Sequence, residues 1–146
     1  MKTKTRDEYT RARDRISRYL ALRDHSRYEL QQKLSRFFSP EIVARVLDEA
    51  ESHGWIAPEE VIAERAAKAL ARKCKSQRYI EGALRKRRLP VPPRDTENEI
   101  DKIRQLVERK FGPAAELSFE EKAKAFRFLK YRGFDDRSIR QVLNEK

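Results

Sequence analysis

Basic side chains are concentrated in the middle of the chain, in a pattern that could bind phosphate groups. Eight of the residues from Arg72 to Arg88 are Lys or Arg, against the single acid Glu81. Such a stripe can neutralise the backbone phosphates of DNA, or face an acidic protein groove, without the fixed geometry that reads bases. The competing interpretation is a solvated face that only keeps the protein soluble. The candidate contacts in this stripe are Arg65, Lys68, Arg72, Lys75, Arg78, Arg85, Lys86 and Arg88.

The charge of the whole chain favours the same kind of partner. Its 35 Lys and Arg residues outnumber its 24 Asp and Glu residues, which gives a formal net charge of +11. An excess of this size is typical of proteins that bind nucleic acid or an acidic protein surface. Three more candidate contacts lie at the far end of the sequence: Arg127, Lys130 and Arg132.

Two features near the stripe leave alternatives open. Gly82 lies between Arg78 and Arg85, where it either lets the backbone of a partner approach or is a tolerated surface glycine. Tyr79 and Tyr131 are expected to be exposed, as is Tyr28, but base stacking is a weak prediction because most aromatic residues fall at core or turn positions. These core or turn residues are Tyr19, Trp55, Phe126, Phe128 and Phe134.

The residues that could carry catalysis are few and isolated. His25 and His53 each lie beside a predicted helix boundary, and neither has a partner at metal-ligand spacing. Cys74 is the only cysteine and has no histidine near it in the sequence. We therefore expect no enzymatic activity, no metal and no cofactor. Because no apolar run is long enough for a signal peptide or a membrane span, we expect a cytoplasmic protein without membrane contact.

The elements that must position these charges are helices. Apolar residues recur at helical spacing, for example Val61, Ile62, Ala66, Ala69 and Leu70. Helix starts are predicted at the capping boxes Ser26/Glu29, Thr96/Glu99 and Ser118/Glu121, at Ser39 before Pro40, at Pro58, at Ser76 and at Asp135 or Asp136, and helix stops at Gly54, Gly112 and Gly133.

These signals predict an all-α protein of eight or nine helices. Aligning Leu34 with Leu84 and Leu129 brings similar helix ends into register, which indicates tandem three-helix units; a generic helix bundle is the alternative. The predicted division is a basic N-terminal tail at 1–8, a first unit at 9–57, a second at 58–100 with a Pro-rich break at 89–93, and a third at 101–146.

Three stretches of the sequence together resemble one family. The first runs from Ala21 to Ser26 and continues through Leu34 and Val46-Leu47 to Gly54-Trp55-Ile56. The second is Ala63-Glu64-Arg65 with the basic helix around Ile80 and Leu84, and the third runs from Lys122 to Phe134. This combination resembles RecX, the regulator of the bacterial recombinase RecA. Two departures concern the middle: Pro90 to Ile100 is short, and Trp55-Ile56-Ala57-Pro58 replaces the commoner Leu-Asp-Asp start.

The resemblance implies three tandem three-helix units in an elongated, curved array. It also implies binding to the RecA–DNA filament, with contacts to single- and double-stranded DNA, and inhibition of ATP hydrolysis, strand exchange and coprotease activity in recombination and the SOS response. Binding along the filament groove and blocking of growing ends are both compatible with it. We expect a monomer. The alternative function is a sequence-independent nucleic-acid binder that acts without RecA.

Overall fold

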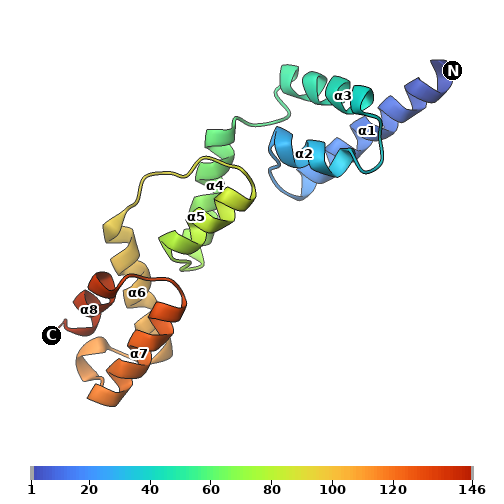
Figure 1. Ribbon diagram of the computed structural model, residues 1–146. Helices are drawn as coiled ribbons and strands as arrows, with labels where there is room; N and C mark the ends of the chain where they lie inside the picture. The colour runs from blue at the N-terminus through green and yellow to red at the C-terminus, as the bar shows by residue number, and fades with distance from the viewer. Residues whose placement is uncertain (1, 146) are drawn as a thin grey trace. The chain divides into compact units, whose positions relative to one another are not determined.

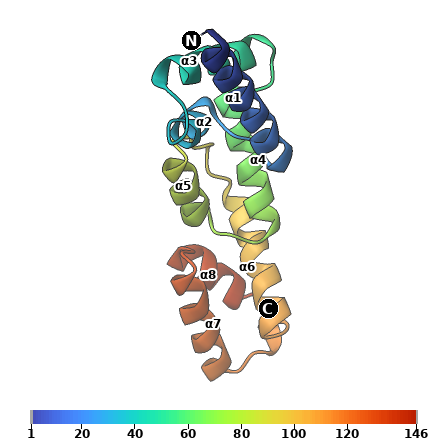
Figure 2. The ribbon, with the colours of Figure 1, turned by 90° about the vertical axis from the view of Figure 1, so that its right-hand side faces the viewer.

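The computed structural model describes residues 2–145, and every regular element in that range is a helix (Figures 1 and 2). Eight α-helices confirm the predicted all-α class and the predicted number of eight or nine. None of these helices is long and apolar enough to cross a membrane. The elements are α1 (Lys2–Leu22), α2 (Arg27–Leu34), α3 (Pro40–Ser52), α4 (Glu59–Arg72), α5 (Gln77–Lys86), α6 (Thr96–Lys110), the short 3₁₀ helix η1 (Ala114–Glu116), α7 (Phe119–Tyr131) and α8 (Asp136–Leu143).

The chain forms two compact units. The first contains the residues up to Ala63 together with Arg87–Pro90, and the second contains Glu64–Lys86 together with the residues from Val91 onward. The division therefore falls inside α4 and again after α5. A compact unit can hold more than one three-helix repeat, so the predicted boundaries of three repeats remain a prediction.

The first unit is built on the packing of α1, α2 and α3, which lie together in Figures 1 and 2. Ala12 and Ile16 of α1 are fully buried against Leu30 and Leu34 of α2 and the apolar face of α3. Each large aliphatic side chain removed from water in this way contributes about 1.5–3 kcal/mol to folding.

The predicted N-terminal tail is part of a helix. Helix α1 begins at Lys2, so residues 2–8 are helical, and Met1 lies outside the described residues. The sequence contains no Gly or Pro before Pro40 that would stop the helix. Glu8 also accepts a hydrogen bond from the amide of Ser39 at 3.0 Å, which ties the start of α1 to the start of α3.

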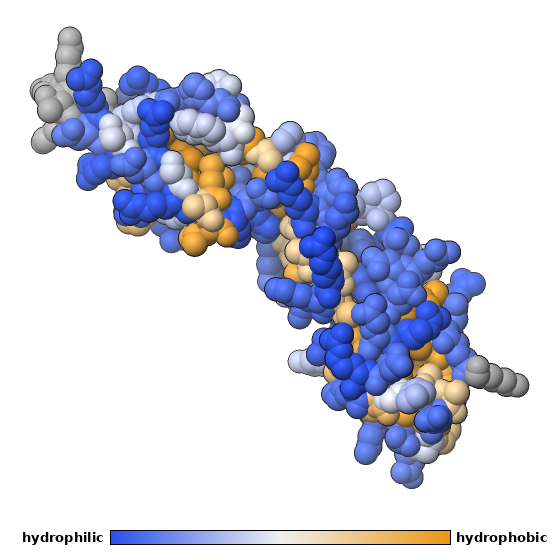
Figure 3. All heavy atoms as spheres, turned by 180° about the vertical axis from the view of Figure 1, so that it is seen from behind, coloured by the Kyte–Doolittle hydropathy of each residue, from blue (hydrophilic) through white to orange (hydrophobic). Residues whose placement is uncertain are grey.

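The second unit has its core between α6, α7 and α8. Ile103 and Val107 lie on the buried face of α6, Leu129 on that of α7, and Ile139 and Val142 on that of α8. Cys74, from the connection between α4 and α5, is buried in the same core. Hydrophilic side chains cover most of the face shown in Figure 3, as expected for a chain in which 40% of the residues are charged.

Most predicted helix ends are confirmed, and one start is wrong. Capping boxes are formed by Ser26/Glu29 and Ser118/Glu121. Helix α6, however, is capped by Asp95, whose carboxylate accepts from the amide of Asn98, and not by Thr96. Glu99 cannot complete a capping box because its carboxylate binds the amide of Gln77 and the ammonium of Lys102.

One predicted core position is also wrong, and the glycine stops are confirmed. Ala69 is exposed on α4, although Ile62 and Ala63 of the same helix are buried. Gly54, Gly112 and Gly133 have φ of 71°, 100° and 93°, the left-handed conformation that ends a helix at little cost only for glycine.

Candidate nucleic-acid interface

Ten of the eleven predicted contact residues lie in the second compact unit. Nine of these ten are exposed, and Lys75 is half-buried. The eleventh, Arg88, belongs to the first unit, where its guanidinium lies 4.4 Å from the ring centroid of Tyr28.

The cations of α4 share one flank of that helix. Arg65, Lys68 and Arg72 are separated by three and four residues, a spacing that places side chains on one face. The ammonium of Lys68 pairs with Glu64 at 2.9 Å, and this hydrogen bond lowers the pKa of the Glu64 carboxyl. Both partners are exposed, so the pair contributes little to stability and leaves Lys68 accessible.

A left-handed residue joins α4 to α5. Cys74 has φ of 58°, and the amide of Lys75 returns to the carbonyl of Leu70 at 3.1 Å, which closes the last turn of α4. Ser76 then caps α5, because its hydroxyl accepts from the amide of Tyr79 at 3.1 Å. A left-handed conformation is costly for a residue other than glycine. Burial of the Cys74 side chain in the core holds the turn in place despite this cost.

The same turn contacts the end of α7. The Ser76 hydroxyl donates to the carbonyl of Arg132 at 2.9 Å. Gly133 follows with so little space that an added Cβ would lie 3.0 Å from Ser76 Oγ and 3.7 Å from the Cβ of Arg78. Lys130 and Arg132, which the sequence places at a far end, therefore lie beside the start of α5.

We call this region the junction surface. It consists of the cations of α5 and of the connection before it together with those at the end of α7: Lys75, Arg78, Arg85, Lys130 and Arg132. Arg127 is not part of it, because this residue lines a separate groove with Phe119 and Phe126. Lys86 is exposed at the end of α5 and lines neither cleft of the junction.

A polar cleft of about 610 Å³ opens on one side of α5. Its acidic residues are already engaged: Glu81 binds Arg94 at 3.0 Å, and this hydrogen bond lowers the pKa of the Glu81 carboxyl. Glu99 pairs with Lys102 at 2.7 Å and Asp136 with Lys130 at 2.7 Å, while Asp135 caps α8.

The remaining cations of this cleft are accessible to an anionic partner. Arg78 and Arg85 are exposed, and their guanidinium groups form no hydrogen bond or ion pair within residues 2–145. Because the nearby carboxylates are held by other groups, the cleft presents two guanidinium groups that could bind phosphate. Sequence reasoning missed Arg94, whose pairing with Glu81 leaves these two arginines unpaired.

A second groove, of about 430 Å³, lies on the other side of the junction. It is lined by two exposed tyrosines, a half-buried phenylalanine and two cations, with no acid among them: Cys74, Lys75, Ser76, Tyr79, Phe128, Tyr131 and Arg132. Sequence reasoning expected Tyr28, Tyr79 and Tyr131 to be exposed; Tyr79 and Tyr131 are, whereas Tyr28 is half-buried. It missed their shared groove, for which the sequence contains no local signal.

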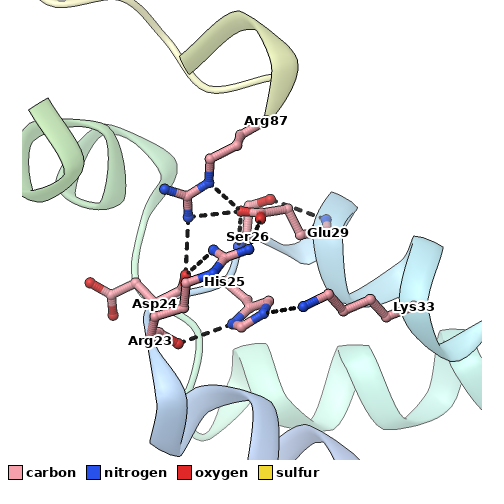
Figure 4. Close-up of polar contacts among 7 residues, drawn as sticks. All are labelled: Arg23, Asp24, His25, Ser26, Glu29, Lys33 and Arg87. Carbon is pink, nitrogen blue, oxygen red and sulfur yellow. Dashed lines mark hydrogen bonds and ion pairs between the residues drawn. The ribbon is translucent and has the colours of Figure 1, made fainter. Parts of the chain in front are cut away.

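Arg87 has a structural function although it lies within the basic run. Its guanidinium donates to Glu29 Oε1 at 3.0 and 3.1 Å and to the carbonyl of Asp24 at 3.0 Å (Figure 4). Burial alone would raise the Glu29 pKa, but hydrogen bonds from Arg23, Arg87 and the Ser26 amide lower it to about 2. Arg87 thus holds the residues after α5 against the start of α2.

His25 lies in the same network and fills a turn, as its position in the sequence predicts. It is buried between α1 and α2, with Nδ1 3.0 Å from the carbonyl of Arg23 and Nε2 2.7 Å from the ammonium of Lys33 (Figure 4). Burial lowers its pKa, and the neighbouring cations Arg23 and Lys33 lower it further. These contacts fit a neutral ring that donates from Nδ1 and accepts at Nε2.

Within residues 2–145, no group of three or more His, Cys, Asp or Glu side chains is arranged to hold a metal ion. The second unit presents exposed cations and exposed aromatic rings, and the acids of its polar cleft are engaged by other groups.

Comparisons with known proteins give a consistent result. Residues 12–49 match a family described as RecX, first three-helix domain, and residues 97–143 match RecX, third three-helix domain. The regulatory protein RecX of Cronobacter sakazakii is 31% identical, over 96% of this chain and 94% of the relative. That of Herminiimonas arsenicoxydans is 30% identical, over 90% of each chain.

Solved structures agree with this result at the level of the fold. The crystal structure of RecX from Lactobacillus salivarius superposes with a TM-score of 0.74, over 94% of this chain and 95% of that one, at 16% identity. Together with the two matched domains, this shows a fold of tandem three-helix repeats.

Proposed function

The chain belongs to the RecX family of regulatory proteins, and from this premise we propose that it binds the RecA–DNA filament and lowers its activity. The affected reactions are the ATP hydrolysis, strand exchange and coprotease activity through which the filament acts in recombination and the SOS response. The partners in this proposal are RecA and the DNA within the filament, both single- and double-stranded.

The observation that supports this proposal is the charge distribution of the junction surface. The carboxylates of the polar cleft beside it are held by Arg94, Lys102 and Lys130 or are used in capping, whereas the guanidinium groups of Arg78 and Arg85 have no hydrogen-bonded partner within residues 2–145. A surface with engaged acids and unpaired guanidinium groups favours phosphate-rich ligands.

The proposed mechanism is a shift of equilibrium. A ligand that binds one state of a filament more tightly than another moves the population toward that state by its differential affinity. No bond is made or broken by this chain. Binding along the filament and capping of its growing end are two ways of producing such a shift.

The first test measures RecA's ATP hydrolysis on single-stranded DNA, with this protein added well below the RecA concentration. We expect clear inhibition that persists when excess free DNA is supplied, because the ligand is the filament. Unchanged hydrolysis, or inhibition that disappears with free DNA, would instead identify a general nucleic-acid binder.

A charge-reversal variant tests the predicted contact residues of α4 and α5. Arg72→Glu with Arg78→Glu places two negative charges where we expect phosphates, so binding to the RecA–DNA filament should fall at least tenfold. Arg109→Glu with Lys124→Glu changes the net charge equally at exposed positions outside the predicted contacts and should bind as the unchanged protein does. Both should keep their helical circular dichroism. Equal losses in the two variants would show that only total charge matters.

A further inference from the structure

The groove between the α4–α5 connection and the end of α7 contains large aromatic surface that the fold does not use. Tyr79 is 50% exposed and Tyr131 is 93% exposed, so neither ring contributes much to the core. Phe128 is half-buried and lines the same groove. Exposed aromatic rings that converge on one cleft are a common sign of a binding site.

The cations around these rings define the charge of the ligand. The ammonium of Lys75 lies 4.9 Å from the ring centroid of Tyr79, and the guanidinium of Arg132 lies 4.7 Å from that of Phe128. No acid lines the groove. A ligand that fits must therefore offer a flat apolar surface next to negative charge.

From this geometry we infer that the groove takes an unstacked base of single-stranded nucleic acid, an inference that rests on the proposed function. Tyr131 and Tyr79 provide stacking surfaces, and Lys75 and Arg132 hold the phosphates on either side of the base. The cleft, of about 430 Å³, falls within the usual size range of small-ligand sites. A duplex keeps its bases inside the stack and would present only phosphate here.

The shape of the groove depends on two local features of the backbone. The left-handed Cys74 turns the chain so that Lys75 and Ser76 face α7, and Ser76 then holds the Arg132 carbonyl at 2.9 Å. The two tyrosines thus come from helices that are joined by a specific hydrogen bond. This pre-organisation reduces the ordering that binding would otherwise require.

The test compares three probes on the full chain at one salt concentration: a labelled oligothymidylate, an abasic strand of equal length and a duplex of equal length. Tyr131→Ala, and separately Tyr79→Ala, should weaken oligothymidylate binding about tenfold and leave the other two probes unchanged, because only the first offers free bases. Tyr131→Trp should keep the affinity. Phe37→Ala removes another exposed aromatic ring, 57% exposed, in the first compact unit and outside the groove, and should change nothing.

The inference is wrong if both tyrosine variants bind oligothymidylate like the unchanged protein, or if all three probes weaken together. RecA ATP hydrolysis is measured in parallel to separate this inference from the proposed function. If binding depends on free bases but RecA is not inhibited, the inference about the groove stands and the proposed function is wrong. If RecA is inhibited but binding does not depend on free bases, the proposed function stands and the inference about the groove is wrong. Loss of RecA inhibition in Tyr131→Ala with unchanged oligothymidylate binding would assign the groove to a protein side chain and overturn the inference.

Discussion

At the scale of single residues, Arg87 is a cation that supports the fold through its ion pair with Glu29 and is therefore not available to a partner. The Glu29 side chain is only 10% exposed and that of Arg87 25%. Arg87→Ala removes two hydrogen bonds to this carboxylate and one to the Asp24 carbonyl, so we expect a loss of about 2 kcal/mol in the free energy of unfolding, measured by urea denaturation. Lys68→Ala breaks an exposed pair and should leave the free energy of unfolding almost unchanged. Similar losses would contradict a structural function for Arg87.

His25 should make stability depend on pH. Its pKa in the folded state is lowered from 6.5, mainly by burial, so the unfolded chain binds more protons than the folded one when the pH lies below that value. The stabilisation is complete above about pH 6.5 and is lost as the pH falls toward the lowered pKa. His25→Gln should flatten the fall in unfolding free energy between about pH 7.5 and about pH 5.5. Parallel curves for the two proteins would reject this assignment.

At the scale of elements, Gly133 controls how closely α5 and α7 approach. Gly133→Ala places a Cβ 3.0 Å from Ser76 Oγ at a φ of 93°, so it should cost about 2 kcal/mol through strain and displacement of Ser76. Gly112→Ala has a similar φ of 100° but open space around it, so it should cost about 1 kcal/mol. The difference between the two melting temperatures measures the contact, and equal shifts would show that the contact contributes nothing.

A substitution at Gly82, inside α5, can tell whether this glycine lets the backbone of a partner approach or is only a tolerated surface glycine. Outside its own helix turn, no part of the protein lies within 4 Å of an added Cβ, so Gly82→Ala should stabilise the protein by about 0.5–1 kcal/mol. If the alanine variant also binds the filament normally, Gly82 is a tolerated surface glycine. A stabilised protein with weakened binding would show that the backbone of a partner approaches α5 at this position.

At the scale of the whole molecule, the net charge of +11 should make binding to single-stranded DNA depend steeply on salt. Arg72→Gln with Arg78→Gln should reduce the slope of log K against log salt concentration by about one to two, because each lost phosphate contact releases about one counterion fewer. Arg109→Gln with Lys124→Gln is the control and should keep the slope. An unchanged slope in the first variant would remove these two arginines from the interface.

The helices, most of their ends, the excess of positive charge and the family can all be predicted from the amino-acid sequence. These features are local: a helical period, a serine three residues before a glutamate, or a glycine after the last turn can be recognised within a few residues. Local signals were insufficient at α6, where Asp95 and Thr96 can both cap a helix and the contact between Glu99 and Gln77 excludes the capping box of Thr96.

Which of the charged side chains are available to a partner depends on how the helices pack. Arg87 and Arg78 both belong to the basic run of the sequence. Arg87 binds a glutamate 58 residues away, whereas Arg78 is exposed beside Gly133. The hydrogen bond between Ser76 and Arg132 spans 56 residues and brings Tyr79 and Tyr131 into one groove. The physical reason is that such contacts depend on how the helices pack. The amino acids next to these residues in the sequence do not indicate which distant residue they will contact.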